Sequence, residues 1–230
     1  MADGEIEDVV RRTDPGRWLA SRLVSNPQDR ADLLTLYAFD AELDRAIQVT
    51  SSPLTAELRL TWWFEALEEI AGEGSVRAHP LAQQLCELVR RRRLPIDLLQ
   101  DLIEGRIATL GMAQLDEERA LAWADAVGGS GAVLAALTLG AGEAAPNARA
   151  AGRLMGVGAL LRRGVIGPPT LASSIGRISK DAKTSARRLP VQAFPSVAAA
   201  ALVKDQIRGR RPSELAQRVR LLWASVRGAV

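Results

Sequence analysis

The chain has 230 residues, of which 47% are hydrophobic and 25% charged, so it can build one substantial core and is too apolar for wholesale disorder. Basic residues exceed acidic ones by only three, and so small an excess disfavours a nucleic-acid-binding face; we expect no nucleic-acid partner. A single cysteine, Cys86, excludes an internal disulfide. We expect a cytoplasmic protein, because residues 1–8 lack the basic and apolar regions of a signal peptide.

Helical spacing dominates the chain, and no stretch shows the alternation and β-branched enrichment of a strand. Proline begins several helical runs, as at Asn26-Pro27 and Ser52-Pro53, where Asn26 and Ser52 are good N-cap residues. Helices are predicted over residues 28–49, 53–71, 80–92, 95–110, 116–127, 130–141, 146–163, 168–174, 181–188, 194–208 and 212–227. Many helices with short connections predict an all-α bundle.

Apolar residues form a stripe on the first two long helices, as expected for elements that pack on a core. The predicted stripes are Leu33, Leu34, Leu36, Tyr37, Leu43 and Ile47, and then Leu58, Trp62, Leu67 and Ile70. The longest uncharged stretch, residues 126–142, is short and rich in Gly and Ala, so it is predicted to be part of a tightly packed buried helix pair rather than a membrane span.

The last predicted helix places apolar side chains on one side, with arginines around them. These apolar residues are Leu215, Val219, Leu222, Trp223 and Val226. Such a helix docks either on the bundle or on a membrane surface, and we predict docking on the bundle.

Short motifs spread along the chain resemble, in the same order, those of the squalene/phytoene synthase family. They read LYAF at residues 36–39, ELRLTWW at 57–63, HPLA at 79–82, LIEGR at 102–106 where the family has LIEGM, GRLMGVGALLR at 152–162 and RRLP at 187–190. The likeness covers residues 14 to about 228. It implies an isoprenoid-synthase-type helical bundle with a central cavity over residues 14–230, after an N-terminal tail of residues 1–13.

Members of this family join two allylic diphosphates head to head, and magnesium ions held by carboxylates of two facing helices neutralise the leaving diphosphate. Asp44 stands where the first acidic motif begins, but the residue four positions on is the neutral Gln48. Asp40 and Asp44 do form a DxxxD pair, one helical turn early. That pair either binds one magnesium ion or forms a solvated or salt-bridged face.

The second acidic motif is lost. If Leu161-Arg162 is the family's Leu-Arg pair, Ala159 and Arg163 occupy the positions of its metal-binding residues. Alanine supplies no ligand, and arginine repels a cation. We therefore expect no cofactor, with Mg²⁺ required only if the protein is active, and we hypothesise an ion pair between Asp44 and Arg163 in place of the metal cluster.

The vestigial ligand pocket is predicted to be lined by Tyr37, Asp40, Asp44, Arg59, Trp62, Trp63, Arg162 and Arg163. Trp62 and Trp63 either line this pocket or pack in the core, and Arg59 either meets an anion or pairs with Glu57 or Asp44. Any metal ion is expected on Asp40 and Asp44.

The resemblance implies a catalytically inactive family member that acts as an isoprenoid- or lipid-binding module or in respiratory-complex assembly. The chain is similar to the branch that contains a mitochondrial complex I assembly factor, at residues 37–39 and 59–63. The expected partners are an isoprenoid diphosphate or lipid and a protein, with peripheral contact at the inner membrane. The alternative is an active Mg²⁺-dependent prenyl transferase of the squalene or phytoene type, with a rearranged site of Asp40, Asp44 and Glu104.

Overall fold

The computed structural model describes residues 3–50, 52–72, 74–210, 212–228 and 230, and within these residues it contains helices but no strand. The α-helices are α1 (Asp3–Thr13), α2 (Pro15–Ser21), α3 (Pro27–Gln48), α4 (Pro53–Ala71), α5 (Pro80–Arg92), α6 (Ile96–Ile107), α7 (Glu117–Trp123), α8 (Ser130–Thr138), α9 (Arg149–Arg163), α10 (Ile175–Ala186), α11 (Val203–Ile207) and α12 (Glu214–Arg227). A π-helical turn, η1 (Ala124–Gly129), joins α7 to α8. The 3-10 turns are η2 (Gly142–Ala148), η3 (Pro168–Leu171), η4 (Val191–Ser196) and η5 (Ala198–Leu202). The all-α prediction is confirmed.

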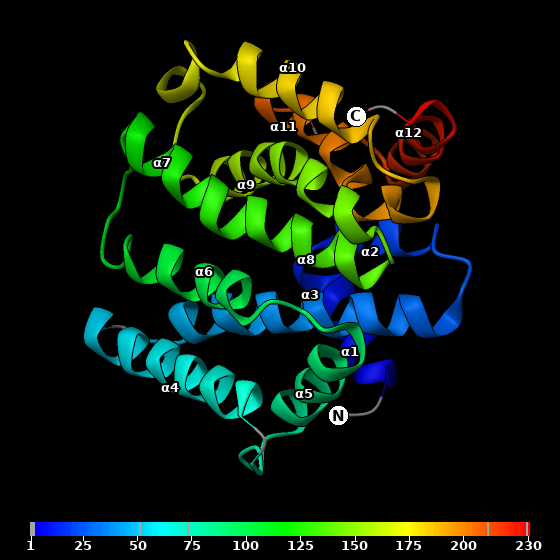
Figure 1. Ribbon diagram of the computed structural model, residues 1–230. Coiled ribbons are helices and arrows are strands. Elements are labelled where there is room, and N and C mark those ends of the chain that lie inside the picture. Colours follow the sequence, from blue (N-terminus) through cyan, green and yellow to red (C-terminus); the bar gives the residue numbers. More distant parts are fainter. Residues whose placement is uncertain (1–2, 51, 73, 211, 229) are drawn as a thin grey trace.

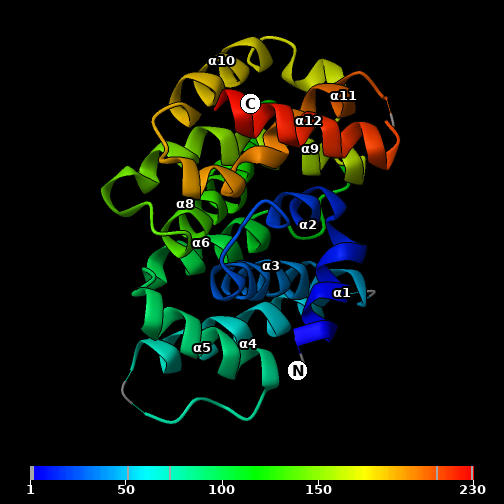
Figure 2. The same cartoon turned by 90° about the vertical axis from the view of Figure 1, so that its right-hand side faces the viewer.

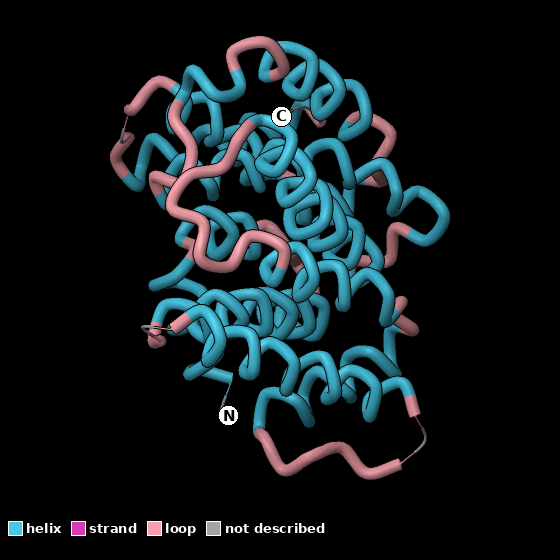
Figure 3. The backbone as a smooth tube through the Cα atoms, turned by 90° about the vertical axis from the view of Figure 1, so that its left-hand side faces the viewer, coloured by secondary structure: helices cyan, strands magenta, loops and turns pink. Residues whose placement is uncertain are grey.

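Helix α3 runs through the middle of the bundle (Figure 1) and packs against α1, α4, α5 and α8. Helices α4 and α5 lie at one end of the molecule, and α10, α11 and α12 lie at the opposite end (Figure 2). Most of the backbone between these ends is helical (Figure 3). Because α3 is covered on several sides, the whole segment of residues 32–39 is buried.

The N-terminus of α3 forms as the sequence predicts. The Asn26 side-chain oxygen accepts hydrogen bonds from the backbone N–H groups of Gln28 (2.8 Å) and Asp29 (3.2 Å), which would otherwise lack partners in the first turn. Ser52 occupies the same position before α4, but its side chain makes no capping hydrogen bond.

The predicted buried stripe of α4 is wrong for two residues, because Leu58 and Trp62 are 63% and 36% exposed. The buried face instead includes Leu60, Trp63 and Leu67. The step of five residues from Trp62 to Leu67 departs from helical spacing, whereas steps of three and four through Leu60, Trp63 and Leu67 keep to it.

The predicted N-terminal tail is also wrong for the described residues 3–13, which form helix α1. Ile6 and Val10 of α1 are 3% and 1% exposed and join the main core, since α1 packs along α3. Trp18 of α2 donates a hydrogen bond from its indole N–H to Glu7 of α1 (3.0 Å). The first two helices are therefore part of the bundle.

The C-terminal third is less regular than predicted. In place of one helix over residues 194–208, the chain forms η4, η5 and the short α11. Pro195 lies inside η4, and because it has no backbone N–H it cannot continue an α-helical hydrogen-bond ladder there. Helix α10 covers residues 175–186, six residues earlier than the start predicted at 181.

Helix α12 docks on the bundle, but not with the predicted face. Its buried residues are Leu221 and Ala224, which pack where α12 meets η5 and α2. The predicted docking stripe of Leu215, Val219, Leu222, Trp223 and Val226 is exposed, at 45–83%.

The predicted tight helix pair is confirmed where η1 crosses α9. A Cβ atom added to Gly152 would lie 2.2 Å from the carbonyl oxygen of Gly128, and one added to Gly156 would lie 2.9 Å from the Ala124 backbone. The continuous helix Glu117–Thr138 is long and apolar enough to cross a membrane, but 67% of its most apolar window is buried inside the bundle. At this crossing the two backbones touch and leave no room for a ligand.

We predict that Gly152→Ala lowers the free energy of unfolding by about 1–3 kcal/mol, because the added methyl group meets rigid backbone rather than a flexible side chain. Urea denaturation followed by circular dichroism measures the effect. The matched control is Gly131→Ala in α8, where an added Cβ meets nothing within 4 Å. That control should leave stability unchanged or raise it by up to about 1 kcal/mol. Equal effects of the two substitutions would contradict the close crossing.

Candidate functional site

Asp40 and Asp44 lie one turn apart on α3, and both point towards arginines of neighbouring helices. Their side chains are 15% and 25% exposed. A partly buried carboxylate keeps its charge only when cations or hydrogen-bond donors compensate for the lost water. The surroundings of these two groups therefore decide what the site can do.

Arg106 of α6 supplies the central cation. Its side chain is 1% exposed, and it donates hydrogen bonds to Asp44 Oδ1 (2.8 Å) and Asp40 Oδ1 (2.6 Å). The third guanidinium nitrogen donates to the carbonyl oxygen of Leu102 (2.8 Å). Every nitrogen of this buried side chain thus has an acceptor, as a buried charge requires.

Two further arginines occupy the other oxygens of the same carboxylates. Arg17 of α2 donates to Asp40 Oδ2 (2.5 Å), and Arg163 of α9 donates to Asp44 Oδ2. The hypothesised Asp44–Arg163 ion pair is therefore present. We call the five side chains of Asp40, Asp44, Arg17, Arg106 and Arg163 the arginine clamp. All four carboxylate oxygens in it accept a hydrogen bond from an arginine.

Aromatic rings support two arms of the clamp. The Arg17 guanidinium lies 5.1 Å from the ring centre of Tyr37, and that of Arg163 lies 5.2 Å from the ring centre of the buried Trp123. Such cation–π contacts fix the planes of the guanidinium groups. Among the residues that the structure describes, the buried Tyr37 hydroxyl has no hydrogen-bond partner; burial raises its pKa, so it stays protonated.

The charges of the clamp hold one another ionised. Burial alone would raise the pKa of Asp40, but Arg106 and Arg17 together lower it well below its usual range. Burial alone would lower the pKa of Arg106, but Asp44 and Asp40 together outweigh this effect, so the pKa is raised overall. Asp40 is therefore a carboxylate at any pH near neutrality and cannot act as a general acid or base there.

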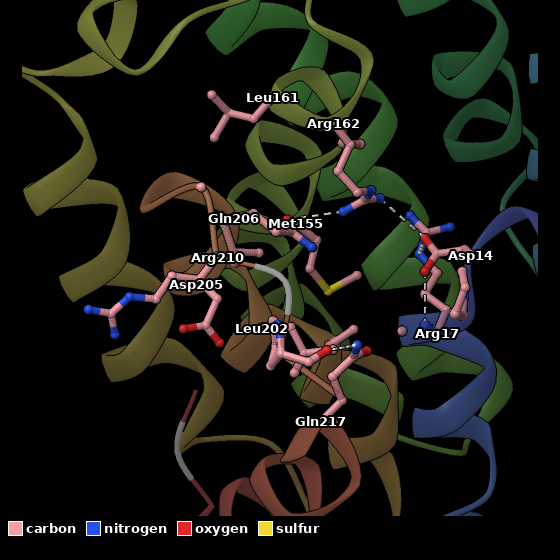
Figure 4. Close-up of a pocket in the computed structure, with 17 residues that line it drawn as sticks. Asp14, Arg17, Met155, Leu161, Arg162, Leu202, Asp205, Gln206, Arg210 and Gln217 are labelled. Atoms are coloured by element: carbon pink, nitrogen blue, oxygen red, sulfur yellow. Dashed lines mark hydrogen bonds and ion pairs between the residues drawn. The ribbon is translucent and has the colours of Figure 1, made fainter. Parts of the chain in front are cut away.

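A pocket of ≈ 620 Å³ lies directly beside the clamp and shares Arg17 with it. It opens between α2, α9, η5 with α11, and the start of α12, and its walls include the apolar side chains of Met155 and Leu202 (Figure 4). Figure 4 shows Arg162 reaching into this region. Arg162 donates to Gln206 (3.0 Å) and pairs with Asp14 (3.7 Å).

Comparison with known proteins gives two findings. The family model of squalene/phytoene synthase matches residues 10–164. The chain belongs to the squalene/phytoene synthase family. A crystal structure of a dehydrosqualene synthase in complex with a ligand matches with a TM-score of 0.73 over 98% of this chain and 95% of that chain. The sequences are 13% identical, so this match shows the fold alone. The search of curated proteins gives no match.

Active members of the squalene/phytoene synthase family are typically Mg²⁺-dependent, but the donor set of this family member does not fit such an ion. Magnesium prefers oxygen ligands in an octahedral arrangement. Here every oxygen of Asp40 and Asp44 is bound by a guanidinium group, and α9 presents Ala159 and Arg163 instead of carboxylates. No group of three or more His, Cys, Asp or Glu side chains suited to a metal occurs among the residues that the structure describes.

Three predicted pocket residues lie elsewhere in this family member. Trp63 is buried against Phe39, with their ring centres 5.3 Å apart. Trp62 packs against Trp63, and the Arg77 guanidinium lies 4.6 Å from the centre of the Trp62 ring. Arg59 is exposed on α4. The reason is that α4 covers the side of α3 that carries Phe39, whereas the clamp faces α2, α6 and α9.

The remaining predicted residues divide between the clamp and the pocket. The clamp contains Asp40, Asp44 and Arg163, and its Arg17 lies over the ring of Tyr37. Arg162 lines the pocket. Glu104, considered as an additional metal ligand, is exposed on α6 and takes no part in the clamp contacts.

Sequence reasoning missed Arg17 and Arg106. A signal for Arg106 was present, since it occupies the position of the methionine in the family's LIEGM segment. A charge at an apolar position of a buried helix requires a partner of opposite charge. No comparable signal marks Arg17.

We predict that Arg106→Met lowers the free energy of unfolding by roughly 3–5 kcal/mol at neutral pH, because Asp40 and Asp44 each lose a buried partner. Chemical denaturation measures the loss. The exposed Arg59→Met serves as the control and should change stability by less than about 0.5 kcal/mol. A loss below about 1 kcal/mol for Arg106→Met would show that the clamp is not a structural centre.

We predict a specific acid dependence for Asp40→Asn. Since the folded-state pKa of Asp40 is lowered, its stabilising effect is complete above the unfolded pKa of about 4 and disappears as the pH falls through the folded value. The stability difference between wild type and variant should therefore be constant from about pH 5 to pH 7 and shrink below about pH 4. Urea midpoints across this range test it, and a difference that grows on acidification would refute it.

Proposed function

We propose that this protein is a non-catalytic member of its family that uses the helical bundle as a binding module for an isoprenoid or lipid with an anionic head group. One observation carries the proposal: all four oxygens of Asp40 and Asp44 are engaged by arginines. Ionisation of an allylic diphosphate produces a multiply charged leaving group that needs a cluster of metal ions. A site that holds three guanidinium groups in place of those ions has no free oxygen ligands to recruit them.

The pocket beside the clamp supports binding without chemistry. Its volume of ≈ 620 Å³ falls in the range of roughly 300–1,000 Å³ usual for small-molecule sites. Met155, Leu202 and Val203 offer apolar surface, and the three arginines of the lining, Arg17, Arg162 and Arg210, outnumber its two carboxylates, Asp14 and Asp205. Apolar walls with a few cations suit an amphipathic ligand with a negatively charged end.

A role in respiratory-complex assembly remains a second proposal. It was predicted from the similarity at residues 37–39 and 59–63, and one observation favours it. Leu54, Leu58 and Trp62 form an exposed apolar line on α4, at 66%, 63% and 36% exposure. Exposed apolar patches of this kind mark surfaces for protein contact. A cytoplasmic location with peripheral membrane contact belongs to the same proposal.

We predict that the purified protein, supplied with Mg²⁺ and farnesyl or geranylgeranyl diphosphate, releases no pyrophosphate and forms no squalene- or phytoene-type product. The physical reason is that the arginine clamp excludes the metal ions from the carboxylates. Native mass spectrometry of freshly purified protein should instead show a retained lipid or isoprenoid. Substitutions Met155→Arg and Leu202→Arg, which fill the pocket, should remove that ligand.

Turnover on the order of 1 s⁻¹ or faster would overturn the non-catalytic assignment. In that case Asp44→Asn should abolish the activity, because the alternative requires Asp44 as a metal ligand. Under the present proposal the same variant changes stability only. An empty protein in native mass spectra, together with no turnover, would leave the non-catalytic assignment intact and refute the ligand-binding role.

A further inference from the structure

Helix α12 carries an apolar face that the bundle does not cover. Leu215, Leu222, Trp223 and Val226 are 72%, 53%, 56% and 83% exposed, and Val219 is 45% exposed. Their spacing of four, three, one and three residues places them on one side of the helix. Figure 2 shows α12 lying across the outside of the molecule. The exposed fractions show that this apolar face is uncovered from Leu215 to Val226.

The same end of the molecule is strongly basic. Residues 175–230 contain twelve Lys and Arg against three Asp and Glu, which gives a net charge of +9. Residues 1–174 contain eighteen Lys and Arg against twenty-four Asp and Glu, which gives −6. The formal net charge of +3 is therefore distributed unevenly, with the positive excess in residues 175–230. Helices α10, α11 and α12 share one end of the bundle (Figure 2), so the basic segment and the apolar face lie together.

Arginines border the apolar face itself. Arg218, Arg220 and Arg227 are exposed on α12, and Arg227 lies over the Trp223 ring, 4.6 Å from its centre. Arg218 pairs with Glu214 (2.5 Å), and Arg220 pairs with Asp205. Long arginine side chains beside apolar residues let a helix lie in a lipid interface with its charges in the head-group layer.

We propose that α12 docks this protein on an anionic lipid bilayer, with Leu222, Trp223 and Val226 in the acyl boundary and the basic C-terminal layer facing the head groups. Charge complementarity selects this occupant, because an anionic surface attracts nearby Lys and Arg residues. A second copy of the chain fits less well, since a symmetric contact through α12 would bring two layers of charge +9 together.

The apolar line on α4 provides an internal contrast. Leu54, Leu58 and Trp62 are exposed there as well, but α4 contains four glutamates and one arginine. An acidic helix is repelled by an anionic bilayer. Membrane docking is therefore specific to the α12 end of the molecule.

Flotation with lipid vesicles tests the proposal. The wild-type chain should float with vesicles of phosphatidylcholine containing about one-third phosphatidylglycerol, and much less with pure phosphatidylcholine. High salt should weaken binding to the anionic vesicles. The combined substitutions Leu222→Ser, Trp223→Ser and Val226→Ser should weaken binding at least about tenfold. The matched control, Leu54→Ser with Leu58→Ser on α4, should leave binding unchanged.

Tryptophan fluorescence tests which helix contacts the bilayer. Brominated acyl chains should quench the wild-type protein, Trp223→Phe should remove that quenching, and Trp62→Phe should retain it. Absence of flotation at low salt, or equal binding to neutral and anionic vesicles, would overturn the proposal. A dimer in light scattering that the α12 triple variant converts to a monomer would overturn it as well, because the face would then be an interface between copies.

Discussion

The structure depends on one constraint: a guanidinium group that is 1% exposed must find its partners inside the bundle. Arg106 meets this requirement by binding two carboxylates of α3 and a carbonyl of its own helix. Those carboxylates in turn bind Arg17 of α2 and Arg163 of α9. Helices α2, α3, α6 and α9 are thus joined around one cluster of charge, and removing Arg106 would take an ion-pair partner from both carboxylates.

The clamp replaces mobile cations with cations that are part of the chain. A metal cluster binds and leaves with its diphosphate, so its positive charge is present when the reaction needs it. The three guanidinium groups of the clamp are always present, and the two carboxylates already neutralise most of their charge. The fold of the family is therefore retained, whereas every oxygen of Asp40 and Asp44 is already bound by a guanidinium group.

The sequence predicted local features well and distant partnerships poorly. Helix spacing identified most elements from α3 to α9, and the family pattern placed Asp44 and Arg163 opposite each other, because both rest on regular positions along a helix. Arg106 was missed because its partners are 62 and 66 residues away. Helices α1 and α2 were missed because their stability comes from packing on α3 and not from a long apolar repeat of their own.

Arginine serves opposite purposes in the two parts of this molecule. In the clamp each arginine pairs with a carboxylate of α3, and Arg17 and Arg163 also lie over Tyr37 and Trp123, so arginine joins helices together. In residues 175–230 most basic side chains are exposed and exceed the acidic ones by nine, so they repel one another. Such self-repulsion is unfavourable for an isolated protein and is relieved when an anionic surface lies against it. The charge distribution therefore separates an interior cluster of paired charges from a C-terminal segment in which basic residues exceed acidic ones by nine.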